Sequence, residues 1–442
     1  MITFLDSRAG RVLQWMVGSA LLVVLALAIG RMMPTQPGYG VAAAILILGI
    51  GLSAFEPAAI PLLSMPFLPV VYRISGAGFD LSVSDAVLFG ATAIALLFTV
   101  RPFNRELRIL LWLSALYQFA TLFAVVANPF SENAVEWFHA WMIISGALIV
   151  GWTIGRSGRA RLGLSLLLLV MCALAVATIV QGLLQFARGD ISPVYLSWPY
   201  TMHKNLVGTV LAFGAITAYA RPVWVAWSRR NALAVFWLLV VAMLFTQSRQ
   251  AIISLAVAVF VLALRGEAQR RRSKLIVIVA VPLFVLVGSL VRDEVVEGNR
   301  FSPVFQRLQW FEETTAYWRE SPWFGHGLRF WYEESSALGY QPPNAELEVL
   351  ASAGVVGLAA FILMVLSTLV VLWRIDPIYG NLAVTVVLAR IVQGQFDQFW
   401  VGAQVSLPFV IAGVSLGAMA YALDDTRLTL RQIPSRPAAY SP

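Results

Sequence analysis

Residues 161–186 read RLGLSLLLLVMCALAVATIVQGLLQF, and this stretch decides the class of fold. From Leu162 to Phe186 it carries no charged side chain. About 20 consecutive apolar residues are enough for a helix to cross the hydrocarbon core of a bilayer. The stretch therefore predicts a transmembrane helix.

The whole composition agrees with that reading. Of the 442 residues, 59% are hydrophobic and 12% are charged, and the mean hydropathy is +0.78. Soluble domains carry about 25% charged residues. Because a lipid-exposed chain must satisfy its backbone polar groups internally, we expect helices. The prediction is an all-α polytopic membrane protein whose main solvent is the lipid bilayer.

Working outward from 161–186, the chain contains about fourteen apolar segments, so we expect about 12–14 transmembrane helices. Some segments are short, and those are expected to be tilted, broken or re-entrant. They are 13–33, 41–55, 57–72, 84–100, 108–127, 135–155, 161–186, 204–220, 232–247, 249–265, 274–291, 345–373, 379–397 and 402–423.

The predicted domain organisation is one bundle with a single large loop. Residues 1–291 hold the first eleven helices, and 292–344 form a large extracytoplasmic loop with amphipathic helices. Residues 345–423 hold the last helices, and 424–442 form a polar tail. The loop is rich in aromatic residues, so disorder is not expected.

The positive residues set the orientation. Assigning alternate gaps to one side collects most of the Arg and Lys in short gaps and tails, which predicts that this side is cytoplasmic. Both termini are then cytoplasmic, and the first apolar run is read as an anchor rather than a cleaved leader. The net charge of +8 follows this topology pattern, so no nucleic-acid partner is expected.

The cysteine and histidine counts argue against a metal site. The single cysteine excludes an intrachain disulfide and a cysteine-based metal site. With three histidines and no clustered ligand pattern, we expect no metal and no cofactor.

Two short outer motifs carry positive charge. Thr246-Gln247-Ser248-Arg249 forms a tight turn between apolar helices, and the Arg249 guanidinium suits phosphate oxygens. The alternative is an interfacial arginine that reaches lipid headgroups. His203, Lys204 and Asn205 open another helix, where the N-terminus attracts anions. Capping and a headgroup contact are the alternative there.

The large loop contains a third motif. Residues 303–320 predict an amphipathic helix on the membrane surface, with Arg307 beside aromatic residues. The SPWFGHG segment, 321–327, then presents the imidazole of His326 between two glycines. A surface ion pair for Arg307 and an ordinary wet loop position for His326 are the alternatives.

The remaining candidates lie in the C-terminal part. Asn344 is a predicted N-cap, and Glu346 and Glu348 follow in the first turns, where they suit the helix dipole or could act as a general base. Gly354 and Gly357 suit close helix packing. Polar side chains also share one helical face and imply a structural network or substrate contact; they are Arg390, Gln393 and Asp397. Arg73 and Asp85 flank the entry to the apolar segment 84–100, and they are weaker candidates for a cavity that these motifs would line on the outer side.

In their order these motifs resemble the O-antigen ligase and O-antigen polymerase superfamily of membrane glycosyltransferases. The matching pieces are GLLQF (182–186), HKN (203–205), TQSRQAIISL (246–255), RLQWF (307–311), SPWFGHG (321–327) and PPNAELEVLASAGVVGLAAF (342–361). Together they cover about residues 180–400. The resemblance implies a GT-C-like helical fold in the bacterial plasma membrane.

The resemblance also implies the reaction. The family moves glycans from polyprenyl-diphosphate carriers onto a glycan or glycolipid acceptor without a metal, and it implies that Arg249 and Arg307 hold the diphosphate. One departure stands out. The histidine proposed as the base in such ligases lies eleven residues before the helix glycine, and counting back from Gly354 reaches Pro343. His326 or Glu346 would replace it, or the reaction differs.

The sequence therefore predicts inverting glycan transfer at the outer face. Arg249 and Arg307, with Lys204, would stabilise the leaving diphosphate, and a carboxylate or imidazole would accept the acceptor's proton. The alternatives are a flippase or transporter of lipid-linked saccharides, for which we find no internal repeat, and a cell-wall glycan polymerase of the shape/elongation/division type.

Overall fold

The computed structural model describes residues 37–76, 79–99, 101–265, 303–332, 336 and 338–432, together with Val23, Leu27, Gly30 and Arg31. The predicted span 274–291 and residues 292–302 of the predicted loop lie outside the described residues, as does most of the predicted span 13–33.

Nearly all of the described chain is helical. The helices of the first half are α3 (Pro37–Phe55), α4 (Ala59–Ser64), α5 (Val83–Phe98), α6 (Arg105–Ala127), α7 (Ser131–Trp141), a π-helical turn (Met142–Gly146), α8 (Ala147–Arg156), α9 (Ala160–Ala187) and α10 (Lys204–Ala220). Those of the second half are α11 (Arg229–Thr246), α12 (Arg249–Leu264), α14 (Pro303–Trp318), α15 (Ala345–Arg374), α16 (Pro377–Gly394) and α17 (Gly402–Gln432), with 3₁₀ turns at Val223–Val225 and Phe330–Tyr332.

One antiparallel hairpin interrupts the helices. Strands β1 (Arg73–Gly76) and β2 (Phe79–Ser82) pair with Arg73 opposite Ser82. The hairpin leads directly into α5, whose N-cap Ser82 and Asp85 form a reciprocal capping box.

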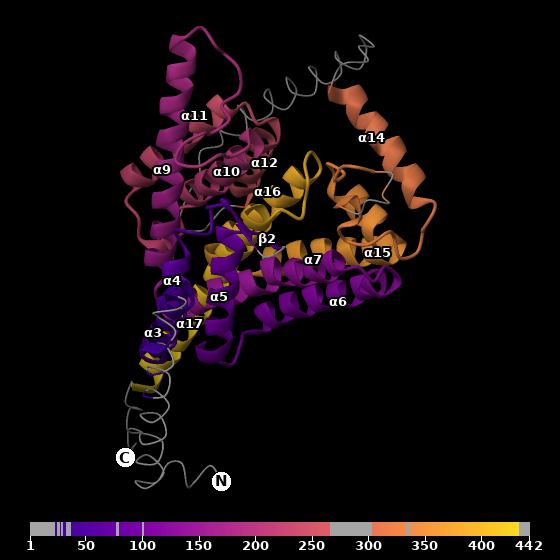
Figure 1. The fold of residues 1–442 in the computed structure, drawn as a ribbon. Helices are drawn as coiled ribbons and strands as arrows, with labels where there is room; N and C mark the ends of the chain where they lie inside the picture. The colour runs from indigo at the N-terminus through magenta and orange to yellow at the C-terminus, as the bar shows by residue number, and fades with distance from the viewer. Residues whose placement is uncertain are drawn as a thin grey trace, which may run out of the picture.

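Six of the described helical stretches are long and apolar enough to cross a membrane, which confirms an all-α polytopic membrane protein. They are Arg105–Ala127, Ser131–Arg156, Ala160–Ala187, Arg229–Thr246, Ala345–Arg374 and Gly402–Asp424. Two shorter apolar helices, α5 and α12, accompany them. Figure 1 shows α9 and α11 side by side at one end, and α6, α7 and α15 running together at the other.

The predicted apolar segment 57–72 does not form one long helix. Helix α4 ends at Ser64 and a run of turns follows. Pro66 and Pro69 lack the backbone N–H groups that would continue the helical ladder. This stretch is too short to span the bilayer as a helix.

Helices α8 and α17 pack closely against each other along a seam of glycines. Gly151 and Gly155 of α8 face the backbone of α17, and Gly413 and Gly417 of α17 face the backbone of α8. A Cβ atom at any of these four positions would collide with backbone atoms of the opposite helix. Small residues four apart let two membrane helices approach this closely.

Several gaps that the charge pattern assigns to the same side contact one another. At one end, Arg265 donates to the carbonyl of Ile375, Trp224 donates to the carbonyl of Ile378, and Arg156 pairs with Asp424. These residues all lie in gaps predicted to be cytoplasmic. The gaps predicted to face outward meet at the other end, described below.

Gly354 does more than allow close packing. Its φ of +64° breaks the helical geometry of α15, and a Cβ there would collide with the backbone of Trp323. The 321–327 segment docks in the break: Val355 N–H donates to the carbonyl of Pro322, and His326 N–H donates to the carbonyl of Ala351. The glycines of this loop and of α15 therefore join the loop after α14 to the bundle.

Candidate functional site

Four of the predicted motifs meet at one place, which we call the outer junction. It joins the beginnings of α10, α12 and α15 to the end of α16. Its residues are His203, Lys204, Arg249, Gln250, Asn344, Glu346, Gln395 and Asp397.

Side-chain amides connect these helix ends. Gln250 Nε2 donates to Asp397 Oδ2 over 2.7 Å, which links α12 to the residues after α16. Gln395 Nε2 donates to Glu346 Oε1 over 2.8 Å, and Asn344 Nδ2 donates to the Gln395 carbonyl over 3.3 Å. The motif around Asn344 is thus fixed against the polar face of α16.

Asn344 has a clear local role. Its Oδ1 accepts from the backbone N–H groups of Glu346 and Leu347, at 3.1 and 3.0 Å. It is therefore the N-cap of α15, as the sequence predicts, and its capping geometry places Glu346 in the first turn.

Positive charge gathers where α10 and α12 begin. Lys204 is the first residue of α10 and is half-buried, and Arg249 is the first residue of α12 and is exposed. Space between the two helices is tight, because a Cβ at Gly208 would collide with Ser248. Two helix N-termini with a cation on each favour a negatively charged ligand.

His203 caps α10, and the neighbouring positive charge acts on its imidazole. Its Nδ1 accepts from the Asn205 N–H at 3.3 Å. Burial, and the neighbouring Lys204, hold the pKa of His203 below its ordinary value, while Asp397 acts in the opposite direction. The neutral imidazole is favoured, which suits the capping role.

Arg307 belongs to α14, which Figure 1 shows standing apart from the bundle beyond α15. Its side chain lies outside what the structure describes. The pairing of Arg249 with Arg307 stays a prediction.

Arg390 and Gln393 face the interior of the bundle. Arg390 is fully buried and donates to Gln404 Oε1 over 2.7 Å, to the Gln398 carbonyl over 2.6 Å and to the Phe399 carbonyl. Gln393 Nε2 donates to Ser254 Oγ over 2.8 Å. In this structure Arg390 therefore holds the turn between α16 and α17, and Gln393 joins α16 to α12.

The three predicted bases sit in different surroundings. His326 Nε2 donates to the Tyr317 carbonyl over 2.9 Å, and its ring stacks on Tyr317. Glu348 is fully buried, and both of its oxygens accept hydrogen bonds, from Gln341 and from the Phe399 N–H. Glu346 Oε2 has no hydrogen-bond partner within the described part of the chain. With Nε2 protonated, His326 Nδ1 is the acceptor nitrogen of the ring, and no described group donates to it. Glu346 Oε2, which is buried, and His326 Nδ1 are therefore the two acceptor atoms left for another group.

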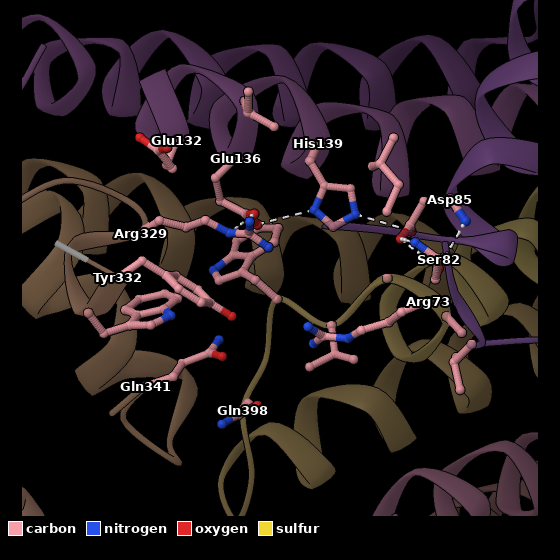
Figure 2. Close-up of a pocket in the computed structure, with 18 of the residues that line it drawn as sticks. Arg73, Ser82, Asp85, Glu132, Glu136, His139, Arg329, Tyr332, Gln341 and Gln398 are labelled. Atoms are coloured by element: carbon pink, nitrogen blue, oxygen red, sulfur yellow. Dashed lines mark hydrogen bonds and ion pairs between the residues drawn. The ribbon is translucent and has the colours of Figure 1, made fainter. Parts of the chain in front are cut away.

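Beside the outer junction lies a cavity of about 310 Å³, which we call the outer cavity (Figure 2). The hairpin, α7, the loop after α14 and the turn between α16 and α17 build its walls. Its polar and aromatic lining includes Arg73, Ser82, Asp85, Glu132, Glu136, His139, Arg329, Trp331, Tyr332, Gln341, Gln398 and Trp400. Gln398 connects it to the outer junction, since Gln398 directly follows Asp397 in the chain.

A line of charged groups forms one wall of the outer cavity. His139 Nε2 lies 3.1 Å from Asp85 Oδ1, and His139 Nδ1 lies 3.2 Å from Glu136 Oε1. Arg329 Nε lies 2.9 Å from Glu136 Oε2. Ser82 Oγ donates to Asp85 Oδ2 over 2.6 Å. Figure 2 shows these groups in sequence along the wall.

The line does not surround a common point. Among the described residues, no three His, Cys, Asp or Glu side chains are placed to hold one metal ion. The carboxylates here face the imidazole and the guanidinium instead.

Sequence reasoning missed Glu136, His139 and Arg329. Glu136 and His139 are separated by three positions on α7, which places them on one face of a helix that enters the bilayer. A charged pair on one face of a span is a signal for a polar interior. Nothing local connects either residue to Arg329, which lies about 190 positions away in the printed sequence.

One family model matches part of the chain. Residues 234–362 match the family model described as O-antigen ligase. The matched segment includes Arg249, Arg329, Gln341 and Glu346, which belong to the outer junction and the outer cavity. No curated protein matches the chain. Over residues 234–362 the chain is therefore similar to the O-antigen ligase family, and the match lies within a bundle of helices that are long and apolar enough to span a membrane.

Proposed function

We propose that this protein transfers or polymerises a glycan from a polyprenyl-diphosphate carrier onto a glycan or glycolipid acceptor at the extracytoplasmic face of the bacterial inner membrane. The observation that carries the proposal is the outer junction. There, two helix N-termini bear Lys204 and Arg249, and hydrogen bonds to the residues after α16 connect α12 and the Glu346 carboxylate to the same segment, next to a polar cavity.

The cationic side of the outer junction suits the diphosphate. The N–H groups at the start of α10 and α12 attract phosphate oxygens, and guanidinium and ammonium groups add charge-assisted hydrogen bonds. Arg249 and Lys204 would stabilise the negative charge that grows on the diphosphate as it leaves. Arg307 would complete this clamp, as the family resemblance implies.

The chemistry is an inverting displacement without a metal. The acceptor hydroxyl oxygen attacks C1 of the donor sugar on the face opposite the diphosphate. The bond from C1 to the phosphate oxygen breaks, and the diphosphate takes the electron pair. Glu346 accepts the proton from the attacking hydroxyl, because its Oε2 is the carboxylate oxygen left without a partner among the described residues.

The outer cavity suits the acceptor sugar. Its volume of about 310 Å³ is at the lower end of the usual range for small-molecule sites, about 300–1,000 Å³. Trp331, Tyr332 and Trp400 offer ring faces, and Gln341 and Gln398 offer donors and acceptors for sugar hydroxyls. An acceptor held there would lie beside the outer junction.

The membrane orientation belongs to the same proposal. The loops that line the outer cavity come from gaps that the arginine pattern predicts to be extracytoplasmic, and both termini are then cytoplasmic. This placement would bring the site to the face where lipid-linked glycans are assembled into envelope polymers.

The decisive experiment compares the envelope glycans of the source bacterium with and without the gene, by mass spectrometry. We expect one glycan to lose its polymer or its final attachment, and a lipid-linked precursor to accumulate. Purified protein in liposomes that contain this precursor and the acceptor should then form the new glycosidic bond. Movement of the precursor across the bilayer with no new bond would indicate a flippase and would contradict the proposal.

A further inference from the structure

The charged line in the outer cavity connects two parts of the chain that are far apart in sequence. At one end Ser82 closes the hairpin, and β-pairing sets Ser82 directly opposite Arg73. At the other end Glu136 holds Arg329, whose guanidinium also lies over the ring of Tyr332, 5.0 Å from its centre. Both arginines line the outer cavity, and Figure 2 shows them on opposite sides of the space.

His139 is the central member of this line. Each of its two ring nitrogens faces a carboxylate oxygen, at 3.1 and 3.2 Å. An ionised carboxylate can only accept a hydrogen bond, so the ring satisfies both partners only when both nitrogens carry a proton. The side chain is also buried, as are Asp85 and Glu136. The imidazolium therefore compensates two carboxylates that would otherwise repel each other in a site poor in water.

The backbone at this point is unusual as well. The helix that carries His139 changes to π geometry at Met142, three residues later. Single π turns inside α-helices are rare and occur frequently at functional sites. The turn fixes the direction in which the preceding part of α7, with Glu136 and His139, faces the cavity.

We propose that His139 is a positioning residue that sets the separation between Arg73 and Arg329, and with it the width of the outer cavity. Through Asp85 and Ser82 it holds the hairpin, and through Glu136 it holds the loop after α14. That the width governs acceptor binding rests on the proposed function, but the separation itself does not.

The test measures the separation directly by pulsed electron paramagnetic resonance between two spin labels. Tyr72 stands at the base of the hairpin and is exposed, and Gly339 stands in the loop with open space around it. The full-length chain with Cys172→Ala, Tyr72→Cys and Gly339→Cys carries the labels. We expect one narrow distance distribution in this background and a broader, shifted one after His139→Gln.

Two further variants keep the test decisive. His203→Gln is the matched control, since His203 lies in the outer junction and outside the charged line, and it should leave the distribution unchanged. If His139→Gln does not fold, Ser82→Ala breaks the line at its hydroxyl end without removing a buried charge, and it should broaden the distribution. A folded His139→Gln or Ser82→Ala protein with lower thermal stability but an unchanged distribution would overturn the proposal, because the line would then only stabilise the bundle.

This readout is independent of sugar transfer. If the protein proves to be a flippase, the label distances still decide whether His139 positions the two arginines. If the labels confirm the positioning but no glycosidic bond forms in liposomes, only the proposed function fails.

Discussion

The outer junction and the outer cavity adjoin each other, yet their residues reach them in different ways. The outer junction is made of helix ends, so each of its residues belongs to a short motif such as HKN or TQSRQ. The charged wall of the cavity takes Asp85, Glu136 and His139 from within helices and Arg329 from a loop. A short sequence motif therefore marks a turn more readily than it marks a polar wall assembled across a bundle.

Removing the guanidinium of Arg249 tests whether the outer junction takes part in glycan transfer. Arg249→Ala should lower glycan transfer by about 10³-fold, the upper range for one donor that stabilises a leaving charge. The amount of folded protein should not change, because Arg249 is exposed. The measurement is product formation in liposomes.

Arg188→Ala is the matched control, because Arg188 is also exposed and ends α9 at the same side of the protein. It should retain full transfer. Full activity in Arg249→Ala would remove the outer junction from the mechanism.

Glu346 and Glu348, the two acidic residues at the start of α15, are expected to have different roles. Glu346→Gln should lower transfer by about 10²-fold, since a positioned base contributes 10²–10⁴. Glu348→Gln should instead destabilise the fold by about 1–3 kcal/mol, because the new amide NH₂ would face either Gln341 or the Phe399 N–H. Measuring the glycan-transfer rate and the thermal unfolding of both variants separates the catalytic role from the structural one. An equal loss of transfer rate in the two variants would show that the carboxylates act together.

Arg390 tests whether polar residues inside the bundle are structural. Arg390→Met should cost about 1–3 kcal/mol of stability, the cost of leaving buried acceptors unsatisfied, because the carbonyls of Gln398 and Phe399 lose their donor. Thermal unfolding in nanodiscs measures this. A stable Arg390→Met protein that no longer transfers glycan would place Arg390 in substrate binding after all.

Gly354→Ala probes how the loop docks on α15. A left-handed backbone strains any other residue by about 1–3 kcal/mol, and the new Cβ would also meet the backbone of Trp323. Limited proteolysis after α14 should become faster. Gly90→Ala, a helical position with open space, should change neither stability nor proteolysis.

The smallest effect concerns pH and His203. Its pKa is held below the ordinary value in the folded protein, so the unfolded chain takes up a proton first as the pH falls. The folded state therefore loses stability as the pH drops through the ordinary histidine range, and the loss levels off below the folded pKa. His203→Gln should flatten this part of the stability curve; an unchanged slope would assign it to another group.

Much of the fold follows from the sequence because a bilayer imposes one solution on long apolar runs. The apolar run 161–186 forms most of α9, and the Asn344 cap begins α15 one residue later. The run 57–72 fails as a span because its prolines stop the helix, which apolarity alone does not reveal.

The candidate site was only partly predictable. His203, Arg249 and Glu346 stand at helix ends, where capping and turn residues give local signals. The burial of Arg390 and the meeting of His139 with Asp85 depend on how helices pack, and no periodicity in one segment specifies its neighbour. Gly354 was read as a packing glycine because a left-handed backbone leaves no mark in a helical pattern.

The glycine seam between α8 and α17 has a consequence for how a long lipid enters and leaves. The backbones of those two helices approach closely at Gly151, Gly155, Gly413 and Gly417, so neither helix can shift sideways there without separating the pair. The two helices therefore form a rigid pair within the bundle. Under the proposed function, a gate for the isoprenoid chain of the donor would then open elsewhere in the bundle. A cross-link between α8 and α17 should accordingly leave glycan transfer in liposomes unchanged.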